Sequence, residues 1–233
     1  VKPDTVQLHQ LTLSEKGGGF AVNVDGLCAW HQGKLSAAKV NLHRLDLDTD
    51  RLASSLKPFN VSDSLTNKLR ALGQVSLTAQ GVYRPDGVSR FNGECHSAIG
   101  NLTIGAYGPR GDYAFQTTAT GLRPRRLVHS PLVPDELAFQ TNGRIKQEGI
   151  NWAVSNLSVN VDRLTYGAKN YSGIQLEGHV SPSQLVASLV SAHPDLQMRA
   201  DINAKMMAWK PSSAQFSVET ERLCLSADRP IGI

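Results

Sequence analysis

The chain has 233 residues and a mass of 25.2 kDa, which is enough for one large β-domain or two small domains. Charged residues make up 19% of it, below the ~25% typical of globular proteins, and uncharged polar residues fill the difference. The net charge of +4 is mild, and basic residues neither form long runs nor interleave with aromatic residues. We therefore expect no nucleic-acid partner, whereas a weak attraction to anionic surfaces such as phospholipid headgroups stays open.

No apolar run approaches the ~18 residues that a membrane-spanning helix needs. The sequence begins at Val1 and stops at Ile233, shortly after a strand-like run, so both ends look cut. We therefore expect a fragment of a longer chain, for which the lack of a targeting signal carries little weight.

The first part of the chain alternates between apolar and polar residues. The run "FAVNVDG" places Phe20, Val22 and Val24 on one face of a strand. The alternation shifts by one residue between Leu42 and Leu45, which predicts a β-bulge. The three glycines at 17–19 precede a strand and not a helix, so they predict a turn and not a phosphate-binding loop.

Two short helices are predicted next, at Asp50–Lys57 and Asp63–Leu72. Leucines recur at helical spacing in both segments. Asp48 or Thr49 can cap the first helix, which Pro58 ends; Ser62 can cap the second helix, and Gly73 suits its C-terminal end.

Three acidic residues, Asp46, Asp48 and Asp50, have the spacing of part of a calcium-binding loop. The glycine and the closing glutamate of such a loop are missing. The spacing therefore favours a strand that runs into a helix N-terminus, where acids suit the helix dipole.

From Gln74 onward the period-2 alternation returns and continues for most of the chain. One phase of each run is apolar and the other is polar, as in the run Ile174–Val180 that follows a turn at Tyr166–Tyr171. The apolar positions that we select as candidates for a ligand-binding face are Val75, Leu77, Ala79, Tyr113, Phe115, Leu137, Phe139, Ile174, Leu176, Leu196, Met198 and Ile202.

These runs predict an all-β, mainly antiparallel fold of about a dozen strands joined by short turns. The expected organisation is a β segment over residues 1–48, the two helices over 49–73, and a second β segment over 74–233. Strand spacing of this kind is typical of a sandwich or a barrel. A closed sheet would bury the apolar face against protein, whereas an open groove would bury it against a ligand, and both give the same sequence pattern.

Motifs for chemistry are missing, so we expect no enzyme, no cofactor and no metal site. The histidines form no HExxH pair, and Cys28, Cys95 and Cys224 form no CxxC pair, which leaves their pairing open. Cys95 and His96 are adjacent in a strand and would point to opposite faces.

A basic cluster, Arg123, Arg125 and Arg126, lies between two strands. It could contact phosphate headgroups at the rim of an apolar surface. The general rule that charges stay in water favours a solvated turn.

Three stretches give the chain a family resemblance. Residues 44–83, a strand followed by two short helices and the strand "GQVSLTAQGVY", resemble a segment of the TamB branch of the AsmA-like proteins. Residues 98–128 look like the next element, and residues 164–206, from "LTYGAKNYSGIQLEGHV" onward, are similar to members of the Bacteroidetes type. The run "SPSQLVASLVSAHPDL" departs from the family pattern, and the first ~40 residues match it only in general terms.

The resemblance implies an internal piece of an elongated sheet bent into a U, a β-taco with an apolar groove. It implies a periplasmic segment of a protein anchored in the inner membrane of a Gram-negative bacterium. The implied ligands are phospholipid acyl chains moving between the two membranes. The implied partner is an outer-membrane barrel of the Omp85 class, which assembles outer-membrane proteins and would bind parts outside this fragment.

Two other functions stay open. The first is a structural or protein-interaction scaffold of an envelope complex, without lipid in the groove. The second is a polysaccharide-acting β-solenoid enzyme, which would need acids and basic residues clustered on one ridge; no such cluster is evident in the sequence. An apolar face that is open to solvent around Val75, Leu77 and Ala79 would favour the groove.

Overall fold

The computed structural model describes residues 4–59, 61–128, 130–207 and 210–223. The chain divides into two compact units, unit 1 (Val1–Arg110) and unit 2 (Gly111–Ile233). In both units nearly all regular structure is antiparallel sheet, and the two predicted short helices are present in unit 1. The predicted all-β class is therefore confirmed. The boundary between the two units follows Arg110. It therefore lies inside the third segment expected from the sequence, residues 74–233.

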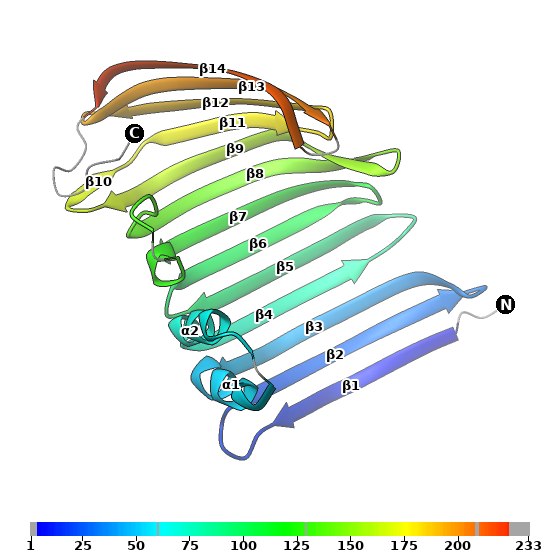
Figure 1. The fold of residues 1–233 in the computed structure, drawn as a ribbon. Coiled ribbons are helices and arrows are strands. Elements are labelled where there is room, and N and C mark those ends of the chain that lie inside the picture. The colour runs from blue at the N-terminus through cyan, green and yellow to red at the C-terminus, as the bar shows by residue number, and fades with distance from the viewer. Residues whose placement is uncertain (1–3, 60, 129, 208–209, 224–233) are drawn as a thin grey trace. The chain divides into compact units, whose positions relative to one another are not determined.

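In unit 1 six strands pair in chain order, each antiparallel to the next, as Figure 1 shows from blue to green. A sheet built this way needs only short connections, because each strand lies beside its sequence neighbour. The strands are β1 (Asp4–Ser14), β2 (Phe20–His31), β3 (Lys34–Asp48), β4 (Gln74–Tyr83), β5 (Val88–Ser97) and β6 (Gly100–Pro109).

The connection between β3 and β4 holds α1 (Thr49–Leu56), a 3₁₀ turn η1 (Lys57–Phe59) and α2 (Asp63–Leu72). Of the two candidate caps of α1, the Asp48 carboxylate is the one that accepts, from the backbone N–H groups of Asp50 and Arg51 at 3.1 Å each. Asp48 is thus a helix cap, as the non-calcium interpretation predicted. Leu56 ends α1 two residues before Pro58.

The predicted cap residues of α2 are also confirmed. The Ser62 hydroxyl accepts from Leu65 N–H at 3.4 Å, and Gly73 ends the helix with φ 64°, a conformation that favours glycine. Thr49 N–H donates to the Gly73 carbonyl at 3.2 Å, which ties the start of α1 to the end of α2. The small side chains of Thr49, Ala53 and Thr66 are buried, so the two helices can approach closely (Figure 1).

Unit 2 repeats the antiparallel design with strands of more varied length, from 3 residues in β10 to 16 in β9. They are β7 (Asp112–Leu122), β8 (Glu136–Glu148), β9 (Asn151–Tyr166), β10 (Lys169–Tyr171), β11 (Ile174–Val180), β12 (Gln184–His193), β13 (Leu196–Met207) and β14 (Lys210–Leu223). The short β10 folds back on β9 through a turn at Gly167, whose φ is 63°, and β11 then pairs with β9 beyond it. The turn predicted at Tyr166–Tyr171 is therefore present. A 3₁₀ turn, η2 (Pro124–Arg126), lies between β7 and β8.

Bulges keep the apolar side chains on one face of each sheet. In β3 the register shifts between Leu42 and Leu45, as the sequence predicts. In β9 Asn156 adopts φ 51° beside a register shift, and in β1 Gln10 adopts φ 43° between Leu8 and Leu11. Each extra residue returns the following side chains to the same face.

Candidate functional site

The cross-strand register of unit 1 assembles one apolar face from all six strands. Directly paired residues share a face of a sheet, so each row of partners can be followed from strand to strand. We define the unit 1 apolar face by four such rows: Phe20–Leu47–Val75; Leu13–Val22–Leu45–Leu77–Cys95–Leu102; Leu11–Val24–Leu42–Ala79–Gly93–Ile104; and Leu8–Gly26–Val40–Gly81–Phe91–Ala106.

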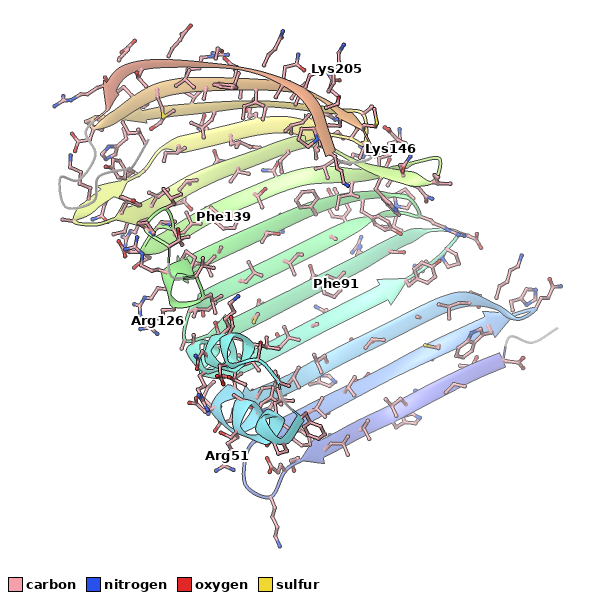
Figure 2. All side chains as sticks on the ribbon, in the orientation of Figure 1. Arg51, Phe91, Arg126, Phe139, Lys146 and Lys205 are labelled. Atoms are coloured by element: carbon pink, nitrogen blue, oxygen red, sulfur yellow. The ribbon has the colours of Figure 1, made fainter. Side chains whose placement is uncertain are left out.

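The unit 1 apolar face is open. Leu13 is 50% exposed, Val40 46% and Phe91, which Figure 2 labels on β5, 43%. Among the described residues of unit 1, the only buried apolar side chain larger than glycine is Ala53, which belongs to α1 and not to the sheet. The predicted residues Val75, Leu77 and Ala79 lie in the middle of this face and are half-buried by their neighbours. Among residues 4–59 and 61–110, no second layer packs against this face.

The opposite face of unit 1 is polar. It carries the alternate residues of each strand, for example Asn41, Gln80 and Asn92, which are paired across β3, β4 and β5. Asn41 donates to the Asp25 carboxylate at 2.8 Å, and His43 also contacts that carboxylate. The hydrogen bond from Asn41, followed by that from His43, lowers the pKa of Asp25. The two faces of the sheet therefore differ sharply in polarity.

The register of unit 2 gives a second apolar face, and it contains all nine predicted residues of this unit. We define the unit 2 apolar face by the rows Leu122–Leu137–Leu164–Tyr171; Phe139–Val161–Ile174–Ser191–Met198; Thr141–Val159–Leu176–Leu189–Ala200–Val218; Leu157–Gly178–Ala187–Ile202–Phe216; and Tyr113–Ile145–Val154–Val180–Leu185–Ala204–Ala214, together with the pairs Phe115–Gly143 and His193–Leu196.

Aromatic side chains cover part of the unit 2 apolar face. The rings of Tyr113 and Trp152 stack with centroids 6.4 Å apart, and those of Tyr171 and His193 meet edge to face at 5.3 Å. Phe115 lies over Gly143, where an added Cβ would come within 2.8 Å of its ring. Ile174 is only 7% exposed and Tyr171 only 3%, so neighbours on the same face shield these side chains.

Several residues of the apolar faces were missed from the sequence. The row members in β1, such as Leu8 and Leu11, lie on either side of the bulge at His9 and Gln10. That interruption breaks the alternation, so the two halves of β1 do not look like one strand. A glutamine with a left-handed backbone leaves no signal in the sequence.

The basic loop between β7 and β8 is more ordered than a solvated turn. Arg125 donates to the Asp135 carboxylate at 2.6 Å and to the Val133 carbonyl at 2.7 Å, and its guanidinium lies 5.9 Å from the centre of the Tyr166 ring. Asp135 in turn accepts from Gly167 N–H at 2.9 Å. Arg125 is thus an internal brace of the loop, whereas Arg123 and Arg126 are exposed.

The placement of the titratable and thiol side chains bears on the sites that the sequence leaves open. No cluster of three or more His, Cys, Asp or Glu residues is placed to hold a metal ion there. Cys28 and Cys95 are unpaired thiols, both on the apolar side of unit 1, and His96 lies on the opposite face from Cys95, as predicted. Cys224 lies outside the described residues. In the ranges that the structure covers, no helix has the length and apolarity needed to cross a bilayer.

Comparisons with family models, with curated proteins and with solved structures gave no match to this chain.

Proposed function

We propose that the chain is a lipid-binding segment of a β-groove protein of the TamB branch of the AsmA-like family. In this proposal acyl chains lie on the unit 1 and unit 2 apolar faces. The observation that carries it is the unit 1 apolar face, which is continuous over six strands and has exposed side chains on β1, β2, β3, β5 and β6. Exposed apolar patches of more than a few hundred Å² mark sites that contact other molecules or lipid.

The dimensions of the unit 1 apolar face suit an acyl chain. Six strands about 4.8 Å apart give a face about 24 Å wide across the strands. An acyl chain in a bilayer leaflet spans about 15 Å, half of the ~30 Å hydrocarbon core, so a whole chain fits along one row. Each methylene removed from water contributes about 0.8 kcal/mol, and equivalent rows allow a chain to move along the sheet with little change in free energy.

The wider setting of the proposal follows the family resemblance. The segment would lie in the periplasm as part of a protein anchored in the inner membrane. It would carry phospholipid between the membranes and act with an Omp85-class barrel through other parts of the chain. No catalytic group is needed for this role, because lipid transfer makes and breaks no bond.

Photo-crosslinking in cells, with the full-length protein, tests the proposal. A photoreactive residue replaces one side chain of an apolar face, Leu77, Phe115, Leu176 or Met198. The matched controls replace the adjacent residue on the opposite face, Thr78, Gln116, Gln175 or Gln197.

We expect phospholipid adducts only from the first set. Protein adducts at these positions, with no lipid, would contradict the proposal and establish the scaffold function instead. Lipid adducts in equal yield from both sets would also contradict it, because they would show contact with a membrane and not occupation of one face.

A further inference from the structure

We propose that the polar face of unit 1 holds a binding site for a neutral oligosaccharide. The site is a hollow of about 320 Å³ over β3, β4 and β5. It lies on the face opposite the unit 1 apolar face, so the inference goes beyond the proposed function and does not depend on it. The polar residues that line the hollow are Asn41, His43, Thr78, Gln80, Asn92 and Glu94. Together they offer hydrogen-bond donors and acceptors, and a hydroxyl group can bind to both.

The register gathers these side chains in two adjacent rows. Asn41, Gln80 and Asn92 are direct partners across β3, β4 and β5. Thr78 and Glu94 are partners in the next row, two residues further along their strands. Amides therefore border one side of the hollow, and a hydroxyl and a carboxylate border the other, so a ligand that lies between the rows is reached from both sides.

Several of the lining groups are available to a ligand. Asn41 donates to the Asp25 carboxylate at 2.8 Å, and His43 contacts the same carboxylate, which fixes the border on β3. Gln80 and Asn92 are exposed, and neither side chain makes a hydrogen bond to another residue that the structure describes. A primary amide has two N–H donors and one carbonyl acceptor, so each can bind two neighbouring hydroxyl groups of a sugar.

An exposed aromatic ring lies beside the hollow. Tyr107 in β6 pairs directly with Arg90 and is a diagonal neighbour of Asn92, a separation within reach of aromatic side chains. Tyr107 is 62% exposed, and it is the only Phe, Tyr or Trp on the polar face among the described residues of β1–β6. A sugar ring has C–H groups on its faces and hydroxyl groups at its rim. It can therefore pack on this ring while its hydroxyl groups reach the amides.

The charges of the polar face favour a neutral ligand. Four rows of this face cross β2–β6 around the hollow, from the row that begins at Ala21 to the row that begins at Leu27. They contain three carboxylates, Asp25, Asp46 and Glu94, and three cations, Lys39, Arg44 and Arg90. These charges cancel when histidine is neutral, so the face has no net attraction for an anionic polymer or a lipid phosphate. Binding must come from hydrogen bonds and packing, which an uncharged oligosaccharide provides.

Titration of the purified chain with neutral oligosaccharides tests the site. The probes are cellotetraose, maltotetraose and chitotetraose. Tetragalacturonate, which has the same length and a carboxylate on every ring, is the charged comparison. The side-chain NH₂ signals of Gln80 and Asn92 in two-dimensional NMR report binding at the hollow. The NH₂ signal of Gln7, an exposed amide in β1, is the control.

We expect at least one neutral probe to shift the Gln80 and Asn92 signals and to leave the Gln7 signal in place. Tyr107→Ala should weaken this binding about threefold to tenfold because the stacking surface is lost, whereas Tyr107→Phe should keep it. Gln80→Ala should weaken it about twofold to tenfold, as the loss of neutral hydrogen bonds would. The matched control, Gln7→Ala, should leave it unchanged. The four substituted side chains are exposed, so the fold should persist in each variant.

Three outcomes would overturn the proposal. The first is that no neutral probe shifts the Gln80 and Asn92 signals. The second is that tetragalacturonate binds as tightly as the best neutral probe, because charge would then govern binding. The third is that Tyr107→Ala and Gln80→Ala both bind like the unsubstituted chain, because the ligand would then lie elsewhere. Each of these outcomes leaves the lipid proposal standing, since that proposal concerns the opposite face.

Discussion

Units 1 and 2 share a strand-by-strand design, but their apolar faces are shielded to different degrees. In unit 1 the face is mostly aliphatic, and Leu13 is 50% exposed and Val40 46%. In unit 2 aromatic side chains crowd part of the face, where Ile174 falls to 7% exposure, whereas Phe216 on the last strand, β14, is 78% exposed. Within the described residues no second layer lies over either face, so burial there comes from larger neighbours on the same face. The shielded part of a face is therefore the part that carries the larger side chains.

The largest difference in stability between the two units is expected when one apolar side chain in each unit is replaced by alanine. Ile174→Ala should lower the stability of unit 2 by about 2–4 kcal/mol, because a buried side chain leaves a cavity. Leu11→Ala in β1 should cost about 1 kcal/mol or less, because Leu11 is already 39% exposed. Native-state hydrogen exchange of the β11 and β1 amides measures both effects. Equal losses would show that the two faces are shielded alike.

Glycine substitutions test what the two units share. A Cβ at Gly26 would lie 2.9 Å from the Lys39 carbonyl oxygen, and one at Gly178 would lie 2.9 Å from that of Val186. Both atoms are backbone, so the paired strand must shift, and Gly26→Ala and Gly178→Ala should each cost about 1–3 kcal/mol.

The control for the glycine substitutions is Gly81→Ala in β4. The nearest atom to a Cβ at Gly81 belongs to the Phe91 ring and is 3.7 Å away, so this change should be tolerated. Denaturant unfolding followed for each unit measures the difference. A loss for Gly81→Ala as large as for Gly26→Ala would rule out the close strand approach as the cause.

The two units also differ in how they connect their strands, and we expect a smaller effect from a substitution there. Unit 1 joins β3 to β4 with capped helices, whereas unit 2 joins β7 to β8 with a loop braced by Arg125 and Asp135. Asp135→Asn should lower the free energy of local opening of that loop by about 1 kcal/mol. The effect is small because the Arg125–Asp135 pair is only partly buried. Faster exchange of the Gly167 amide, which donates to Asp135, would report it. Asp162→Asn, at an exposed carboxylate bonded to Gln140, is the control and should leave that amide unchanged.

Much of the fold could be predicted from the sequence, because alternation and capping are local. The bulge after Leu42, the cap at Ser62 and the end of α2 at Gly73 all depend on residues within one turn or one strand. The same alternation placed every candidate residue on an apolar face. Whether that face is open could not be predicted, because a closed sandwich has the same pattern.

Contacts between distant residues left no trace in the sequence. Arg125 looked like part of a solvated turn because its partner Asp135 is 10 residues away and Tyr166 lies on a different strand. Asp48 and Thr49 were equally good caps until the strand end fixed which side chain reached the helix N–H groups. Such choices depend on how the backbone enters the next element.

The smallest expected effect concerns the polar faces, where the two units hold a carboxylate differently. In unit 1 a neutral amide, Asn41, is the main cause that lowers the pKa of Asp25, whereas in unit 2 Arg144 lowers the pKa of Asp112. Asn41→Ala should raise the pKa of Asp25 toward the ordinary value of about 3.9, and carboxyl NMR titration measures it. Arg144→Gln should do the same for Asp112 and leave Asp25 unchanged.

The sign of the pH effect follows from the lowered pKa of Asp25. A carboxyl whose pKa is lower in the folded state than in the unfolded state stabilises the fold above pH ~4, and this stabilisation is lost as the pH falls through the folded value. The Asn41→Ala variant should therefore lose less stability than the unsubstituted chain between neutral pH and strong acid. An unchanged Asp25 titration in that variant would show that His43 and not Asn41 holds the carboxylate, and would bring unit 1 closer to the charge-paired design of unit 2.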